Sequence, residues 1–178
     1  GGKVRRYVHL HVGPLPATDI CEIEGQRATT LARTVLDLLR TLTMEQSVPI
    51  GDAALRLGLS LEDLAEVAGR CIGWRGMLRA RRAMNFLDPR SESPGESYSR
   101  VVLHRIGVPA PTPQYEVWER EVLVGRVDFC WEEFRTLGEF DGREKYGRLL
   151  RPGQTAADAV FEEKRREDAL RDLGWQIV

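Results

Sequence analysis

The stretch "RVDFCWEEFRTLGEFDG", residues 126–142, carries the clearest structural pattern in the chain. Its apolar residues lie on either side of the polar segment "EEFR", which predicts two short strands joined by a turn. Each predicted strand nevertheless carries acids within its most apolar part. Asp128 lies in the first strand, and Glu139 and Asp141 flank Phe140 in the second. The question for function is what would keep three carboxylates there.

The segments around this hairpin predict an α/β unit. Helix signals and strand signals follow one another in the order helix, strand, strand, strand, helix, strand. They fall at residues 95–107, 114–120, 122–131, 136–140, 156–173 and 175–178. Such an order is typical of a mixed sheet that is flanked by helices.

The first half of the chain predicts a small, mostly helical α+β domain. Two strands come first and four helices follow, at residues 4–12 and 21–25, then 31–42, 48–58, 60–70 and 75–87. Thr29 or Thr30 would cap the first of these helices and Ser60 the third. The stretch "DPRSESPGES", rich in Pro, Ser and Gly, then predicts a boundary. We therefore expect domains at residues 1–88 and 89–178, the second of them truncated at its C-terminus.

Charge and cysteine content exclude several classes of protein. The 26 Lys and Arg residues balance 27 Asp and Glu residues, so any nucleic-acid binding must come from a local patch. Cys21, Cys71 and Cys130 are odd in number and widely spaced, which argues against a disulfide framework or a zinc site and favours a reducing cytoplasm. No apolar run reaches the roughly 18 residues of a membrane helix, so no membrane partner is expected. Because the chain starts with Gly-Gly rather than Met, we also expect it to be a fragment.

The three acids predict either a cation site or an exposed charged surface. Glu139 and Asp141 would share one strand face, and a favourable hairpin register would bring Asp128 level with them. At about 4 Å and an effective dielectric constant of about 20, each carboxylate pair would repel by roughly 4 kcal/mol, which a bound Mg²⁺ would relieve. A hydrolytic site would follow, with Lys145 orienting the attacking water and Glu96 as a further ligand or general base. The alternative is a solvent-facing hairpin whose acids pair with nearby basic residues.

Four segments of the second half resemble a known superfamily. They are "GES", "GRVDF", "GEFDGREKYGRLLRPGQ" and "EKRREDALRDLGW". Together they resemble the PD-(D/E)XK nuclease superfamily, in the branch similar to very-short-patch repair endonucleases. The chain is also similar to the C-terminal part of actinobacterial AbiEi-type antitoxin proteins. This resemblance covers residues 89–178 and implies a restriction-endonuclease-like mixed sheet flanked by helices, whereas residues 1–88 look like the linking domain that precedes it.

The resemblance implies a site for hydrolysing DNA phosphodiester bonds with Mg²⁺ or Mn²⁺. The catalytic residues that it implies are Glu96, Asp128, Glu139, Asp141 and Lys145, of which Asp128, Glu139 and Asp141 would hold the metal. Candidates for phosphate contacts with duplex DNA are Arg126, Arg143, Lys164 and Arg166, and supporting roles fall to Tyr146 and Glu167. One position departs from the superfamily pattern, because Asp141 stands where the pattern has lysine.

Two function classes therefore remain open. The first is a Mg²⁺- or Mn²⁺-dependent endonuclease, which could act as a homodimer, as several members of the superfamily do. The second is a catalytically inactive protein of the same fold that binds DNA, in a toxin–antitoxin or phage-defence system. In a third interpretation the chain's role is contact with a protein such as a toxin, and the helices of residues 29–88 would then matter most.

Overall fold

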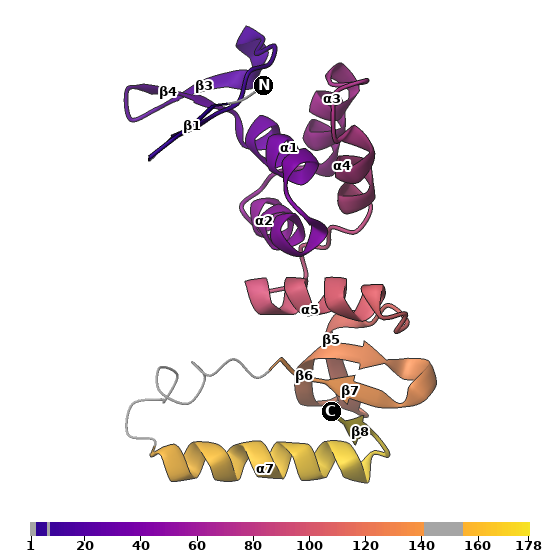
Figure 1. Cartoon of the computed structure of the whole chain (residues 1–178). Coiled ribbons are helices and arrows are strands. Elements are labelled where there is room, and N and C mark those ends of the chain that lie inside the picture. The colour runs from indigo at the N-terminus through magenta and orange to yellow at the C-terminus, as the bar shows by residue number, and fades with distance from the viewer. Residues whose placement is uncertain (1–2, 7, 141–154) are drawn as a thin grey trace.

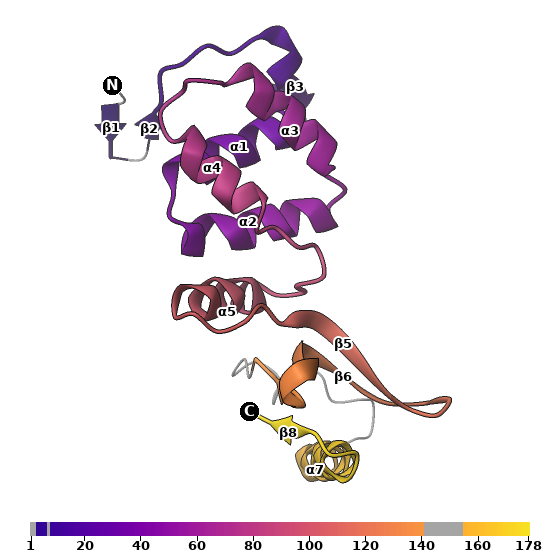
Figure 2. The ribbon, with the colours of Figure 1, turned by 90° about the vertical axis from the view of Figure 1, so that its right-hand side faces the viewer.

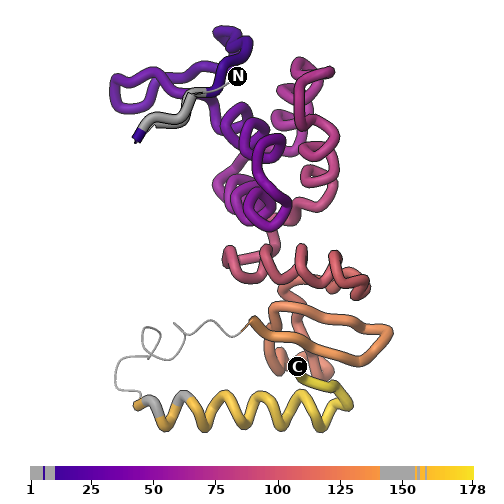
Figure 3. The backbone as a smooth tube through the Cα atoms, viewed as in Figure 1, coloured from indigo at the N-terminus to yellow at the C-terminus, as the bar shows by residue number. Residues whose placement is uncertain are grey.

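The computed structural model describes residues 3–6, 8–140 and 155–178, with the N-terminal strands and the last helix at opposite ends (Figures 1 and 3). The first half starts with strands β1 (Lys3–Arg5), β2 (Val8–Leu10), β3 (Ile20–Ile23) and β4 (Gln26–Thr29), with a short 3-10 helix at Ala17–Asp19. Helices α1 (Leu31–Thr41), α2 (Met44–Arg56), α3 (Leu61–Arg70) and α4 (Met77–Met84) follow. None of the helices in the described ranges has the length and apolar character needed to cross a membrane.

The second half confirms the predicted α/β class and its mixed sheet. It contains α5 (Pro94–Arg105), β5 (Thr112–Glu119), β6 (Val122–Trp131), β7 (Thr136–Gly138), α7 (Ala156–Asp172) and β8 (Gln176–Ile177). The four strands lie in the order β5-β6-β7-β8, and only the last pair is parallel. Figures 1 and 2 show α5 on one side of this sheet and α7 on the other.

Helix starts are set by side chains that accept hydrogen bonds from the third residue of each helix. Thr30 and Ser60 do so for α1 and α3, which confirms both predicted caps. Helix α2 instead starts at Met44, four residues before the predicted start, because Thr43 and Gln46 form a reciprocal capping box.

One strand prediction in the first half is wrong, and another is incomplete. Residues 4–12 do not form one strand, because the chain reverses at Arg6 and β1 pairs with β2. The strand expected at residues 21–25 is present as β3, but its partner β4 was not predicted. Glu24 and Gly25 both have positive φ, 51° and 76°, which is the backbone of a two-residue hairpin turn.

The second half also contains a smaller departure that matters for the site. Strand β7 ends at Gly138, whereas the sequence predicted a strand through residue 140. Glu139 and Phe140 therefore lie just beyond the strand, although the Glu139 N–H still donates to the carbonyl oxygen of Val178 at 3.1 Å.

Helix α5 connects the two halves across the predicted boundary at residues 88 and 89. The Arg100 guanidinium donates to the carboxylate of Asp52 on α2 at 2.9 Å, to Ser91 Oγ at 3.1 Å and to the Phe86 carbonyl at 2.7 Å. Asp52 is fully buried, and its other oxygen accepts the Asp88 N–H at 2.8 Å. Breaking a buried ion pair of this kind is strongly destabilising, so these contacts fix α5 against α2.

Candidate active site

The first turn of α5 holds the helix acid of the predicted site. Ser93 caps the helix and Pro94 occupies its first position, which suits a residue whose missing N–H would lack a helical partner. Glu96 follows in the first turn with only 5% of its surface exposed. Its Oε2 accepts the Glu92 N–H at 2.9 Å. The N-terminal end of a helix dipole also favours a negative charge at this position.

Strand β6 supplies the second acid, and the chain after β7 passes directly beside it. The β6–β7 register pairs Phe129 with Gly138, so the residues that follow β7 lie next to Asp128. The Phe140 N–H donates to Asp128 Oδ2 at 2.8 Å. The Phe140 ring also lies against Gly95 in α5, where an added Cβ would stand 2.2 Å from the ring atom Cε1. The absence of a side chain at residue 95 therefore allows this approach.

A third residue, Gln114 of β5, joins the two acids. Its side-chain Nε2 donates to Glu96 Oε2 at 2.8 Å and to Asp128 Oδ1 at 3.2 Å. The two carboxylate oxygens are thus separated by no more than the sum of these distances. Sequence reasoning missed Gln114, because a single amide in an alternating strand carries no functional signal. Its unusual backbone, with φ of 51°, has no signature in the sequence either.

Glu139 has a different partner from the other two acids. Its Oε1 lies 2.5 Å from the guanidinium of Arg166 on α7, and Arg166 also contacts Glu163. Burial acts to lower the pKa of Arg166, but its hydrogen bonds to Glu163 and Glu139 outweigh burial and raise that pKa. The Arg166 side chain fits over Gly125 of β6, where an added Cβ would lie 3.3 Å from Arg166 Cδ. Glu139 is therefore held toward α7, whereas Asp128 is linked toward α5.

The remaining candidates divide into those with local ion pairs and those outside the described residues. Arg126 pairs with Glu92 at 2.9 Å, and Glu167 pairs with Arg171 along α7 at 2.9 Å. Lys164 is exposed on α7. Four candidates lie outside the described residues, namely Asp141, Arg143, Lys145 and Tyr146.

The donor atoms of the site suit a hard divalent cation. Carboxylate oxygens are the ligands that Mg²⁺ and Mn²⁺ prefer. Among the residues that the structure describes, no three His, Cys, Asp or Glu side chains gather closely enough to hold a metal. Glu96 and Asp128 do converge, and Mg²⁺ commonly uses only one or two carboxylates together with water and substrate phosphate. Glu96 and Asp128 therefore supply the one or two carboxylates that a Mg²⁺ site needs from the protein.

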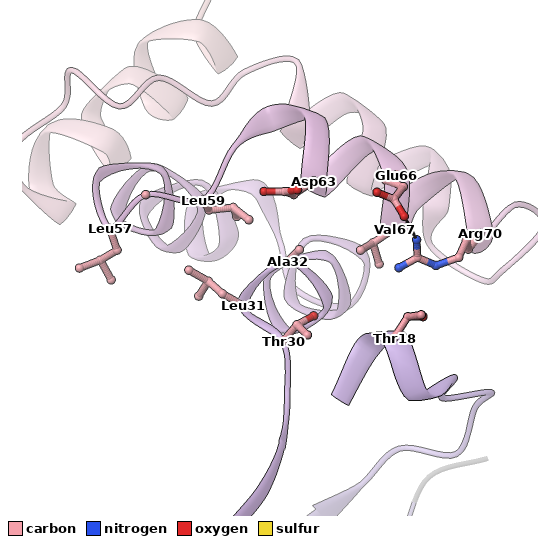
Figure 4. Close-up of a pocket in the computed structure, with 11 residues that line it drawn as sticks. Thr18, Thr30, Leu31, Ala32, Leu57, Leu59, Asp63, Glu66, Val67 and Arg70 are labelled. Atoms are coloured by element: carbon pink, nitrogen blue, oxygen red, sulfur yellow. Dashed lines mark hydrogen bonds and ion pairs between the residues drawn. The ribbon is translucent and has the colours of Figure 1, made fainter. Parts of the chain in front are cut away.

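A separate groove of about 380 Å³ lies in the helical half of the chain. Figure 4 shows Leu31 and Leu57 on one side of it and Asp63, Glu66 and Arg70 along α3. Arg70 is paired with Glu66 and with the buried Asp19, both within hydrogen-bond distance. None of the predicted site residues lines this groove.

Comparisons with known proteins leave the family prediction untested. No family model matches the chain, and no solved structure matches it. Two proteins of Mycobacterium tuberculosis, each described as uncharacterized, are 30% identical to it over 179 aligned positions. The match covers the whole of this chain and 63% of each relative, so the chain spans less than two thirds of the length of these relatives.

Proposed function

We propose that residues 89–178 form a metal-dependent endonuclease-type domain that hydrolyses phosphodiester bonds of duplex DNA. The observation that carries this proposal is the convergence of Glu96 and Asp128 on one amide group. These acids come from α5 and β6, which are far apart in sequence, and the amide that links them carries no charge. Two converging carboxylates suit a divalent cation, which would also supply hydrolytic chemistry.

The four acids would have related roles. Asp128 and Glu96 would hold Mg²⁺ or Mn²⁺, and Glu139 and Asp141 would complete the ligand set. When bound, such an ion lowers the pKa of a coordinated water and offsets charge on the reacting phosphate. Lys145 would orient the attacking water, in place of the lysine that the superfamily carries at position 141. Tyr146 and Glu167 would support this arrangement from outside it.

Basic residues beside the acids would bind the DNA backbone. Arg126 lies on β6, two residues from Asp128, and its ion pair with Glu92 is about half exposed on both sides. Exposed pairs of this kind contribute little, typically below about 1 kcal/mol, so a phosphate can replace Glu92 as the partner of Arg126. Arg143, Lys164 and Arg166 would extend the contact along the strand. The three cysteines form no disulfide, which suits the reducing cytoplasm where we place this activity.

A plasmid-nicking assay in Mn²⁺ tests the proposal. Asp128→Asn and Glu96→Gln remove one negative charge each while preserving side-chain shape, and each should slow nicking by about 100-fold or more. Glu121→Gln, in the exposed turn between β5 and β6, is the matched control and should nick at the wild-type rate. If the Asp128 and Glu96 variants nick the plasmid at the wild-type rate, the proposed nuclease activity of this site is contradicted.

A second candidate function is binding without cleavage. Two observations favour it: the lysine of the superfamily pattern is replaced by Asp141, and Glu139 is engaged by Arg166 rather than grouped with Asp128. In this case the chain would act as an antitoxin-like or DNA-binding protein that has kept the acids for structure, with a toxin as a protein partner. Electrophoretic mobility shifts with duplex DNA separate the two functions. Equal binding by wild type and Asp128→Asn, with no nicking by either in Mn²⁺, would favour this second function.

A further inference from the structure

The side chain of Gln114 contacts both Glu96 and Asp128. An amide nitrogen carries two hydrogens, and here each is directed to a different carboxylate, at 2.8 and 3.2 Å. The opposite orientation of the amide would place its oxygen against two acceptors, which is repulsive. The nitrogen therefore faces the acids, and the amide bridges them without adding a charge.

The backbone at Gln114 is strained in a way that serves this contact. Its φ of 51° is in the left-handed region, which costs a residue other than glycine about 1–3 kcal/mol inside a strand. The neighbouring residues Pro113 and Tyr115 pair with Phe129 and Val127, which flank Asp128 on β6. The strained residue thus lies opposite Asp128 and under the first turn of α5. Strain of this kind persists only where the surrounding structure enforces it, and it is concentrated at functional sites.

We propose that Gln114 is a positioning residue that keeps the Glu96 and Asp128 carboxylates close together, so that one divalent cation can use both. This inference rests on the proposed function and adds to it a residue outside the acid set. Two neighbouring carboxylates repel, so loss of the Gln114 donors should favour their moving apart, although each also accepts a backbone N–H, and a cation would then have to draw them together again. A neutral donor prevents the separation and leaves lone pairs on both carboxylates for the cation, whereas a lysine or arginine would take the cation's place.

Two substitutions of Gln114 by side chains of similar size should change the Kd for Mn²⁺ in opposite directions. Gln114→Met removes both donors, so the carboxylates are no longer held and the Kd for Mn²⁺ should rise about 10-fold, as for other residues that orient metal ligands. Gln114→Glu also removes the donors but adds a third carboxylate, so the Kd should fall about 10-fold. In EDTA, Gln114→Glu should have a lower Tm than Gln114→Met, because three carboxylates then repel one another. Gln26→Met and Gln26→Glu, at an exposed position of β4, are the matched controls and should leave Kd and Tm unchanged.

The experiment is an isothermal titration with Mn²⁺ and a thermal melt in EDTA for all five proteins. Opposite shifts of Kd in the two Gln114 variants support the positioning role. Equal shifts, or a Met variant that binds Mn²⁺ like wild type, overturn it, because a residue that only fills space would give that result. If wild type itself binds no Mn²⁺, the proposed nuclease function fails. The melts in EDTA then still decide whether Gln114 bridges the acids, because a Gln114→Met variant with the Tm of wild type contradicts the bridge.

Discussion

Arg166 on α7 and Glu139 beyond β7 form an ion pair across 27 positions of sequence, with both side chains about three quarters buried. Arg166 thus engages Glu139, whereas Gln114 links Glu96 and Asp128. Glu139 therefore has a cationic partner, whereas the amide that joins the other two acids is neutral. A cation that uses Glu139 must compete with Arg166 for it.

Arg166→Met tests this competition. Removing the guanidinium should tighten Mn²⁺ binding several-fold, because Glu139 becomes available as a ligand, and should weaken duplex binding, because one phosphate contact is lost. Hydrogen bonds to charged groups contribute about 1.5–3 kcal/mol, so the variant should also unfold at lower urea concentration. Arg165→Met, at the exposed neighbouring position, is the control for all three measurements. Unchanged Mn²⁺ affinity in Arg166→Met would take Glu139 out of the proposed ligand set.

Gly95→Ala tests the contact between α5 and Phe140. The new Cβ would lie 2.2 Å from the Phe140 ring, and overpacking of this kind costs about 1–3 kcal/mol of unfolding free energy. Gly69→Ala is the matched control, since it lies within α3 with nothing within 4 Å of the added atom and should gain about 0.5–1 kcal/mol. The double variant with Phe140→Ala should recover most of the loss. Additive effects of the two substitutions in urea denaturation would contradict the contact.

Asp19→Asn tests the buried charge network at the start of the helical half. Asp19 is 1% exposed and pairs with Arg33 at 2.8 Å and with Arg70 at 2.5 Å. The substitution should cost up to about 3–5 kcal/mol at pH 7, because it removes the buried counter-charge of Arg33, which then keeps only the partly exposed Asp37 at 2.9 Å.

The cost of Asp19→Asn should depend on pH in a defined direction. Burial alone would raise the pKa of Asp19, but hydrogen bonds from Arg33 and Arg70 outweigh it and hold the pKa below its ordinary value. A carboxylate with a lowered pKa contributes stability above its unfolded pKa of about 3.9 and loses it as pH falls through the folded value. The Tm difference between wild type and variant should therefore be largest near neutral pH and shrink below about pH 4. A constant difference down to pH 2.5 would contradict this assignment.

Thiol reactivity should distinguish the three cysteines. Burial raises the pKa of Cys130 to about 11 and also raises that of Cys71, so both hold little thiolate at pH 8. Cys21 lies partly exposed in β3. In the native protein, Ellman's reagent should react rapidly with one thiol per chain, and Cys21→Ser should abolish that phase. Three thiols should react after denaturation in urea, and rapid reaction of more than one native thiol would contradict the burial of Cys71 and Cys130.

Hydrophobic periodicity predicted which segments are helices and which are strands, because buried positions recur with a different period in each. The bounds of β6 and the caps at Thr30 and Ser60 are as expected, since each depends on neighbouring residues alone. The reversal at Arg6 was missed because it contains neither glycine nor proline. The turn at Glu24 and Gly25 was missed as well, although "EG" between two polar strands is compatible with it.

The candidate site was predictable only in part. Sequence order placed Glu96, Asp128 and Glu139 on the elements where the structure has them or directly beside them. The side chains that contact these acids come from elements that are distant in sequence, and no local sequence pattern predicts such contacts. Gln114 reaches Glu96 through a backbone conformation that has no recognisable signature in the sequence "TPQYE". Arg166, 27 residues after Glu139 in the chain, reaches it from α7.

Helix α5 carries Glu96 and Arg100 one turn apart, and each residue faces a different half of the chain. Arg100 needs the buried Asp52 of α2 as its counter-ion, so a disturbance of the N-terminal helices that moves Asp52 must also displace α5. Glu96 would then shift against Gln114 and Asp128. The position of Glu96 therefore depends on how α5 packs against α2, and a partner that binds the N-terminal helices would be expected to change the geometry of the acids.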